Sequence, residues 1–126
     1  MAAILVVEDE PTIRELVRDI LSASHECRAV RTAEEGLELL ASSACDLIIT
    51  DVKLPGMDGD EFMRRARETN PALPVILISG GYGYDEAAYE EEGAFGFLLK
   101  PFRAGELEGM VARALGRGGG GRVTGR

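Results

Sequence analysis

Five short apolar runs, separated by longer amphipathic stretches, mark out the chain from residue 3 to about residue 115. The first, third and fourth runs are continuously apolar and do not alternate, which is typical of strands covered on both faces. The runs predict strands at residues 3–7, 27–30, 47–50, 74–79 and 94–99.

The stretches between these runs carry helical patterns. In the first stretch, apolar residues spaced by one and three positions form a single stripe: Ile13, Leu16, Val17, Ile20 and Leu21. Pro11 suits the first turn of that helix, because its missing N–H has no partner there in any case. A similar pattern predicts a last helix over residues 104–115, with Leu107, Val111, Ala114 and Leu115 facing inward.

Three polar residues have the position of helix caps. Thr32 with Glu35 forms a capping-box signature, and Asp58 with Glu61 has the same spacing. Asp85 is predicted to cap a short acidic helix that ends at about residue 92.

Strands that alternate with helices predict right-handed crossovers and a parallel sheet. Five such units indicate an α/β three-layer sandwich: a five-stranded parallel sheet with five flanking helices. The common flavodoxin-like strand order 2-1-3-4-5 suits this number of strands. Ligands of such sheets bind beyond the carboxyl ends of the strands, near the switch point between strands 1 and 3.

Bulk properties favour a single cytoplasmic domain. The chain has 126 residues, of which 45% are hydrophobic, and no apolar run approaches the ~20 residues of a membrane span. Cys27 and Cys45 do not form a metal-type or redox-type pair. The net charge of −8 argues against direct nucleic-acid binding.

The composition changes after residue 115. Residues 1–115 are predicted to form the domain, and residues 116–126 to form a disordered tail rich in glycine and arginine. No effector domain follows, so the chain is expected either to act alone by protein contact or to be part of a larger protein.

Polar residues follow four of the five predicted strands. Glu8 and Asp9 follow the first strand, Asp51 the third, Ser79 ends the fourth, and Lys100 follows the fifth. Each residue alone has an ordinary explanation as a cap, a turn residue or a solvated side chain. Together they fall at the same edge of one sheet, which favours a functional site.

Three carboxylates at that edge would repel one another, by roughly 4 kcal/mol for a pair at 4 Å and an effective dielectric near 20. Protons or a cation must relieve this repulsion. A hard, oxygen-ligated cation such as Mg²⁺ (or Mn²⁺) suits the site. Asp51 could then act as a nucleophile toward phosphorus, while Lys100 and Ser79 hold phosphoryl oxygens.

Four ordered motifs resemble the response-regulator receiver family of two-component signalling. Val-Val-Glu-Asp-Glu at 6–10 looks like the family's acidic pair, and residues 51–59 look like its phosphoacceptor segment. Ile-Ser-Gly at 78–80 resembles the hydroxyl position, and residues 97–102 resemble the aromatic-then-lysine-proline segment. The resemblance covers residues 3–115.

The resemblance implies specific roles. Asp51 would be the phosphoacceptor, Ser79 and Lys100 the phosphate-binding residues, and Ser79 and Phe97 the switch pair. The metal ligands would be Glu8, Asp9, Asp51 and the backbone carbonyl of Lys53. A cis bond is expected between Lys100 and Pro101.

The resemblance also implies partners. The phosphodonor would be a sensor histidine kinase or a histidine phosphotransfer protein. The surface made by the fourth helix, fifth strand and fifth helix would signal to a downstream protein, and phosphorylation could drive homodimer formation. The domain would assist its own phosphorylation and dephosphorylation without being an enzyme for another substrate.

Three alternatives were compared with this interpretation. A flavodoxin needs phosphate-binding donors after strand 1, where Glu8, Asp9 and Glu10 would repel phosphate. A phosphatase with an aspartyl intermediate would normally have a second acid two residues after its nucleophile, where this chain has Lys53. A receiver-like module that binds partners without phosphorylation is disfavoured by the intact acidic, hydroxyl and lysine set.

Overall fold

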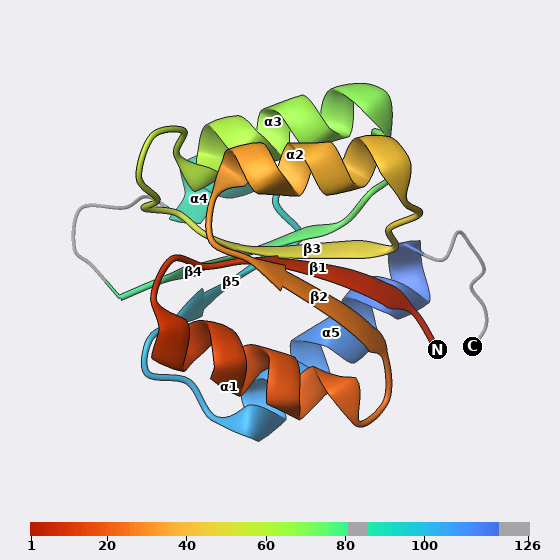
Figure 1. Cartoon of the computed structure of the whole chain (residues 1–126), viewed down its shortest axis with the longest axis vertical. Coiled ribbons are helices and arrows are strands. Elements are labelled where there is room, and N and C mark those ends of the chain that lie inside the picture. The colour runs from red at the N-terminus through yellow and green to blue at the C-terminus, as the bar shows by residue number, and fades with distance from the viewer. Residues whose placement is uncertain (81–85, 119–126) are drawn as a thin grey trace.

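Five parallel strands form one sheet in the computed structural model, which describes residues 1–80 and 86–118 (Figure 1). The strand order is β2-β1-β3-β4-β5, as predicted. The strands are β1 (Ala3–Val7), β2 (Glu26–Val30), β3 (Leu47–Asp51), β4 (Val75–Ser79) and β5 (Gly96–Leu99).

Helices cover both faces of this sheet, which makes the predicted three-layer sandwich (Figure 1). Helices α2, α3 and α4 lie over one face, and α1 and α5 lie over the other. The helices are α1 (Pro11–Ser22), α2 (Ala33–Ser42), α3 (Gly59–Thr69), α4 (Glu86–Glu91) and α5 (Ala104–Gly118). None of the helices in the described ranges combines the length and apolar character needed to cross a bilayer.

The central strands are buried because each is covered on both faces. Every residue of β3 and β4 is buried, including the polar Thr50, Asp51 and Ser79. Alternate residues of β1 enter opposite cores, with Leu5 packed toward α2 and α3 and Val6 toward α1 and α5. The continuously apolar runs of the sequence therefore mark the strands in the middle of the sheet.

The two predicted capping boxes, at the starts of α2 and α3, have different outcomes. The capping box of α2 is confirmed, because the Thr32 hydroxyl accepts from the Glu35 amide at 3.1 Å and the Glu35 carboxylate accepts from the Thr32 amide at 3.2 Å. The capping box predicted for α3 is wrong. Asp58 precedes the helix but makes no side-chain cap, and the Glu61 carboxylate pairs with Arg65 at 2.8 Å.

The structure extends the last helix beyond its predicted end and leaves some predicted features outside the described residues. Helix α5 continues to Gly118, three residues beyond the predicted end of the domain at residue 115. Residues 119–126 of the predicted tail lie outside the described residues, as does Asp85, the predicted cap of α4.

Candidate functional site

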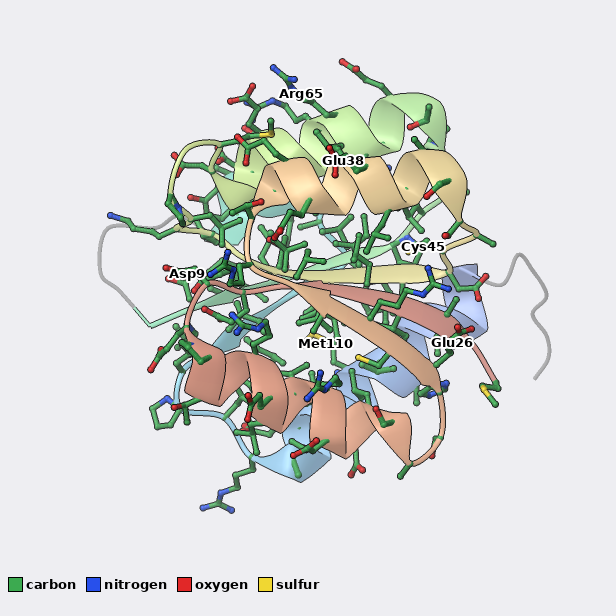
Figure 2. The ribbon with its side chains drawn as sticks, in the orientation of Figure 1. Asp9, Glu26, Glu38, Cys45, Arg65 and Met110 are labelled. Atoms are coloured by element: carbon green, nitrogen blue, oxygen red, sulfur yellow. The ribbon has the colours of Figure 1, made fainter. Side chains whose placement is uncertain are left out.

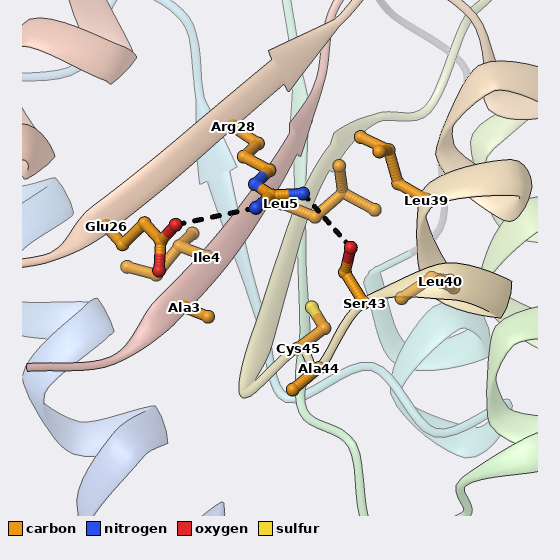
Figure 3. Close-up of a pocket in the computed structure, with 10 residues that line it drawn as sticks. All are labelled: Ala3, Ile4, Leu5, Glu26, Arg28, Leu39, Leu40, Ser43, Ala44 and Cys45. Atoms are coloured by element: carbon orange, nitrogen blue, oxygen red, sulfur yellow. Dashed lines mark hydrogen bonds and ion pairs between the residues drawn. The ribbon is translucent and has the colours of Figure 1, made fainter.

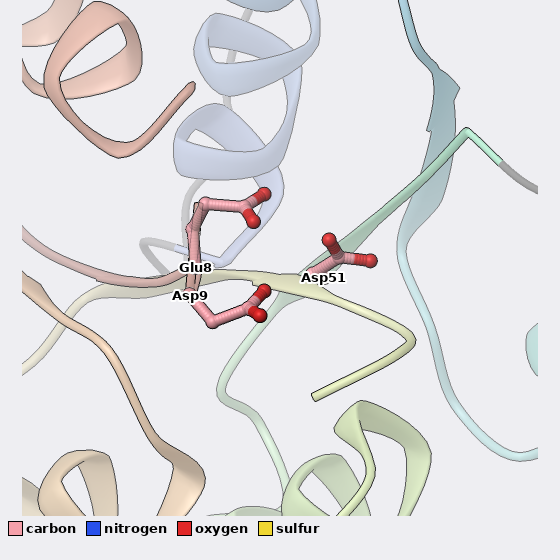
Figure 4. A group of neighbouring side chains, drawn as sticks. All are labelled: Glu8, Asp9 and Asp51. Atoms are coloured by element: carbon pink, nitrogen blue, oxygen red, sulfur yellow. The ribbon is translucent and has the colours of Figure 1, made fainter. Parts of the chain in front are cut away.

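The carboxyl ends of four strands bring the predicted site residues to one edge of the sheet. Glu8 directly follows β1, Asp51 and Ser79 are the last residues of β3 and β4, and Lys100 directly follows β5. Strand register sets their neighbourhood, because Asp51 pairs with Ile78, next to Ser79. Figure 4 shows the side chains of Glu8, Asp9 and Asp51 at this edge, all extending toward the same side of the view.

Lys100 joins the two buried carboxylates of this edge. Its ammonium nitrogen lies 2.7 Å from Oδ2 of Asp51 and 3.0 Å from Oε1 of Glu8. Burial lowers the pKa of Lys100, but the contacts with Asp51 and Glu8 outweigh this effect and raise the pKa above its ordinary value. The residue is therefore held as a cation between two acids.

Glu8 is almost fully buried, with 1% of its surface exposed. Its Oε2 accepts a hydrogen bond from the Glu10 amide at 3.1 Å. Its Oε1 is close enough to Lys100 for an ion pair but accepts no hydrogen bond within the described residues. Burial raises the pKa of Glu8 to about 7; the Asp51 charge adds to the rise, while the Glu10 amide and Lys100 oppose it.

Asp51 has a partner on each carboxylate oxygen. Oδ1 accepts from the Lys53 amide at 3.1 Å, and Oδ2 accepts from the Lys100 ammonium. The two hydrogen bonds fix the direction of the carboxylate, and the residue is 7% exposed, so only a small part of it is accessible at the strand end. This combination of fixed direction and access is what a nucleophile requires.

The acidic cluster has the composition of a site for a hard divalent cation. One carboxylate oxygen from each of Glu8, Asp9 and Asp51 lies within 4.8 Å of the others. Asp9 is exposed, whereas Glu8 is buried with Oε1 lacking a hydrogen bond. Oxygen ligands that include one unsatisfied buried atom fit a cation such as Mg²⁺.

The predicted switch residues occupy the neighbouring strands. Ser79 is buried at the end of β4, and its carbonyl accepts from the Lys100 amide at 2.9 Å. Phe97 is half-buried in β5 and stacks on Tyr89 of α4, with ring centroids 5.9 Å apart and ring planes 14° apart. The Lys100–Pro101 bond is cis, as expected.

A comparison with family models identifies the family of this chain. The model of the response regulator receiver domain family matches residues 4–112 of this chain. The chain belongs to the response regulator receiver domain family. Both the predicted family and the predicted fold of this receiver domain are therefore confirmed.

Relatives of the receiver domain are regulators of greater length. The chain is 43% identical over 120 residues to the response regulator protein FleR of Pseudomonas aeruginosa, covering 92% of this chain and 25% of that protein. It is 37% identical over 113 residues to the DNA-binding transcriptional regulator NtrC of Escherichia coli, covering 87% of this chain and 24% of that protein. The chain thus spans about a quarter of the length of these two relatives.

Solved receiver domains have the same architecture. The structure of a response regulator receiver domain protein from Clostridium thermocellum superimposes with a TM-score of 0.88 at 30% identity. The match covers 93% of this chain and 96% of that chain, so the whole domain is shared.

A separate cavity lies at the opposite end of the sheet. It has a volume of about 150 Å³ and lies between β1, β2 and the end of α2, with Arg28 bridging Glu26 and Ser43 at its rim (Figure 3). Figure 2 shows Asp9 at one end of the sheet and Glu26 and Cys45 at the other. The acidic cluster contributes no residue to this cavity, so the cavity is not part of the candidate site of the receiver domain.

Sequence reasoning missed two residues that hold the site together. Arg14 of α1 donates to the backbone carbonyl of Glu8 at 3.0 Å and to that of Asp9 at 3.4 Å. Gly59 begins α3 directly against the backbone of Asp51. The glycine had a visible signal, since it ends the phosphoacceptor motif, whereas Arg14 is indistinguishable in sequence from a solvated helix residue.

The metal-free receiver domain is expected to lose stability between about pH 4.5 and about pH 7 because of Glu8. The folded state keeps a proton in this range that the unfolded state releases, so the free energy of unfolding falls as the pH rises. The contribution is fully present below pH 4.5 and is lost as the pH passes through 7. The effect amounts to about 3 kcal/mol.

Urea unfolding in EDTA, at about pH 5 and about pH 7.5, measures this contribution. Glu8→Gln should remove the pH dependence that Glu8 causes and should be more stable than the wild type at the higher pH. Glu38→Gln, which changes an exposed acid of α2, serves as the control and should follow the wild type. Equal pH dependence in Glu8→Gln and the wild type would contradict the raised pKa.

Proposed function

We propose that this receiver domain accepts a phosphoryl group on Asp51 in a reaction that requires a divalent cation. The observation that carries the proposal is the setting of the Asp51 carboxylate. One oxygen is bound by the Lys53 amide and the other by the Lys100 ammonium, at an edge that two further acids share. An accessible carboxylate held between a cation and an acidic cluster suits phosphoryl transfer.

The cation would be held by carboxylate oxygens of Glu8, Asp9 and Asp51 and by the backbone carbonyl of Lys53. Bound Mg²⁺ or Mn²⁺ supplies positive charge that neutralises phosphoryl oxygens and orients them for in-line transfer. Glu8 supports this assignment, because it is a buried carboxylate whose Oε1 has an ion-pair contact with Lys100 but accepts no hydrogen bond within the described residues.

The transfer step involves the residues of this chain directly. An oxygen of Asp51 attacks the phosphorus atom of a phosphohistidine, the P–N bond breaks, and its electron pair stays on the imidazole. Lys100 already contacts Oδ2 of Asp51, so a short movement brings its ammonium to a phosphoryl oxygen. The Ser79 hydroxyl, at the end of the neighbouring strand, would bind another oxygen.

Phosphorylation would change the surface formed by α4, β5 and α5. It adds about −1.5 to −2 charges at the end of β3. Movement of Ser79 toward these charges would free space for Phe97, and the stacking of Phe97 on Tyr89 would transmit that movement to α4. A downstream protein, or a second copy of this domain, would recognise the altered surface.

The donor would be a sensor histidine kinase or a histidine phosphotransfer protein in the cytoplasm. The net charge of −8 disfavours direct contact between this domain and nucleic acid. The functional domain would extend to the end of α5 at Gly118, and phosphorylation would not require residues 119–126.

A mass measurement tests the proposed function. In Mg²⁺ and acetyl phosphate, the wild type should gain one phosphoryl group, a mass increase of about 80 Da. Asp51→Asn should gain none, because an amide oxygen is a poor nucleophile and the amide retains no negative charge. Asp19→Asn, which changes an exposed acid of α1, should be modified like the wild type.

Two outcomes would contradict this function. An unchanged wild-type mass, with Mg²⁺ binding confirmed by calorimetry, would identify a module that acts without phosphorylation. Modification of Asp51→Asn at the wild-type rate would place the phosphoryl group on another residue.

A further inference from the structure

The turn between β1 and α1 carries both Glu8 and Asp9, and its backbone is bound by a side chain from the helix that follows. Nη1 of Arg14 lies 3.0 Å from the carbonyl oxygen of Glu8 and 3.4 Å from that of Asp9. Arg14 is half-buried, and within the described residues it forms no ion pair with a carboxylate. Its guanidinium therefore binds backbone carbonyls and no carboxylate of the described residues, although the chain has more acidic than basic residues.

Other hydrogen bonds hold the same turn from its remaining sides. The Glu8 amide donates to the Val30 carbonyl of β2 at 3.0 Å, which ties the start of the turn to the sheet. The Glu10 amide donates to Oε2 of Glu8 at 3.1 Å, and the Arg14 amide donates to the Glu10 carbonyl at 2.9 Å. Arg14 thus binds the carbonyls of Glu8 and Asp9 within a turn whose Glu8 and Glu10 amides have other partners.

A carbonyl held in one direction also restricts the direction of the Cα–Cβ bond of the same residue, from which the carboxylate extends, because both belong to one backbone conformation. The two residues bound by Arg14 are two of the three members of the acidic cluster. Outer contacts of this kind set the orientation of metal ligands, and their loss typically lowers metal affinity 10–100-fold.

The positive charge of Arg14 acts in the opposite sense. A guanidinium next to a cation site repels the cation, so the loss of this charge alone would strengthen cation binding. The two effects of Arg14 on cation affinity therefore differ in sign, which makes them separable by experiment.

We propose that Arg14 is a positioning residue, which holds the carbonyls of Glu8 and Asp9 and thereby aims their carboxylates at the divalent cation. This inference rests on the proposed function, since it assumes that the acidic cluster binds the cation. It assigns Arg14 a role in cation affinity that outweighs the repulsion from its charge.

Calorimetric titration of the full chain with Mg²⁺ tests this role. Arg14→Gln removes the charge and shortens the side chain, and its affinity should be about 10-fold weaker than that of the wild type. Arg18→Gln removes the same charge from an exposed position one turn later in α1 and should stay within about twofold of the wild type. An unchanged or tighter affinity of Arg14→Gln would overturn the proposal.

Measurements without metal separate positioning from a general loss of structure. In EDTA, the Glu10 amide, whose partner is Glu8, should exchange its hydrogen faster in Arg14→Gln than in Arg18→Gln. Amides in the middle of β3 and β4 should keep their wild-type protection. Weaker Mg²⁺ binding without faster Glu10 exchange, or with lost protection throughout the sheet, would overturn the positioning role.

Rescue by lysine completes the test. Arg14→Lys keeps a charged donor, so it should recover part of the Mg²⁺ affinity that Arg14→Gln loses. An Arg14→Lys affinity as weak as that of Arg14→Gln would count against carbonyl binding.

Failure of the proposed function has a different result, because the wild type itself would then bind no Mg²⁺. If the wild type binds Mg²⁺ and Arg14→Gln binds it equally well, only the inference about Arg14 fails.

Discussion

Replacing Gly59 with alanine is expected to destabilise the domain by about 3 kcal/mol or more and to abolish phosphorylation of Asp51. An added methyl group would overlap the carbonyl oxygen of Asp51, and it would lie 2.9 Å from the Asp51 carbonyl carbon and 3.0 Å from Cα of Val52. These are backbone atoms at the end of β3, so no side-chain rotation can relieve the overlap.

Relief would require α3 to move away from β3. That movement would break the 2.8 Å hydrogen bond between the Gly59 amide and the Val52 carbonyl and would displace the strand end that carries Asp51. Urea unfolding measures the loss of stability, and the mass gain with acetyl phosphate measures the loss of function. Both losses should occur together, because the same backbone contact supports the fold and the nucleophile.

Gly105 provides a matched control near the start of another helix. An added methyl group at Gly105 would meet nothing within 4 Å, so Gly105→Ala should stabilise the domain by about 0.5–1 kcal/mol through helix propensity alone. Phosphorylation of this variant should equal that of the wild type. If Gly59→Ala were as stable and as active as Gly105→Ala, the close contact between α3 and Asp51 would be refuted.

The fold was predictable because its strands and helices differ in period and composition. Uninterrupted apolar runs marked β1, β3 and β4, which the structure buries on both faces. The strand ends then followed from topology, since parallel strands place their carboxyl ends at one edge. For that reason Glu8, Asp51 and Lys100 could be grouped from the sequence, and in the structure Lys100 lies within ion-pair distance of both acids.

Features that depend on competition between partners were not predictable. The Asp58–Glu61 spacing matches a capping box, but Arg65 binds the Glu61 carboxylate and the Asp58 side chain makes no cap. Arg14 likewise has several acids nearby in sequence, and only the turn geometry shows that it binds carbonyls. A motif gives the residues that are able to interact, whereas packing decides which of them do.

The charge balance of the site could be predicted only in part from the sequence. The sequence predicted repulsion among three carboxylates, relieved by a proton or a cation. The structure adds that Lys100 already relieves part of it and that a proton on Glu8 relieves more, since the pKa of Glu8 is raised to about 7. Glu8 would therefore have to give up its proton and loosen its contact with Lys100 in order to hold a divalent cation.

Replacing Lys100 with methionine should change Mg²⁺ affinity and phosphorylation in opposite directions. The ammonium occupies carboxylate oxygens of Asp51 and Glu8 at 2.7 Å and 3.0 Å, so it competes with a cation for two of the proposed ligands. Without it, Mg²⁺ should bind more tightly. Phosphorylation should nevertheless slow by about 10²–10³-fold, the typical loss when one donor to a developing oxyanion is removed.

Lys100→Met should also change the stability of the metal-free domain, measured in EDTA. Lys100→Met leaves two buried carboxylates without their cation, so it should destabilise the metal-free domain at neutral pH, and less so near pH 5, where Glu8 carries a proton. Saturating Mg²⁺ should restore much of this stability, because the cation binds only the folded state.

Arg103→Met controls for the loss of one positive charge, since Arg103 is exposed and lies three residues beyond Lys100. It should match the wild type in Mg²⁺ affinity, in phosphorylation rate and in stability. Weaker Mg²⁺ binding by Lys100→Met would mean that Lys100 supports the cation site instead of competing with it. Unchanged phosphorylation would remove Lys100 from the transfer step, because its ammonium would then have no phosphoryl oxygen to bind.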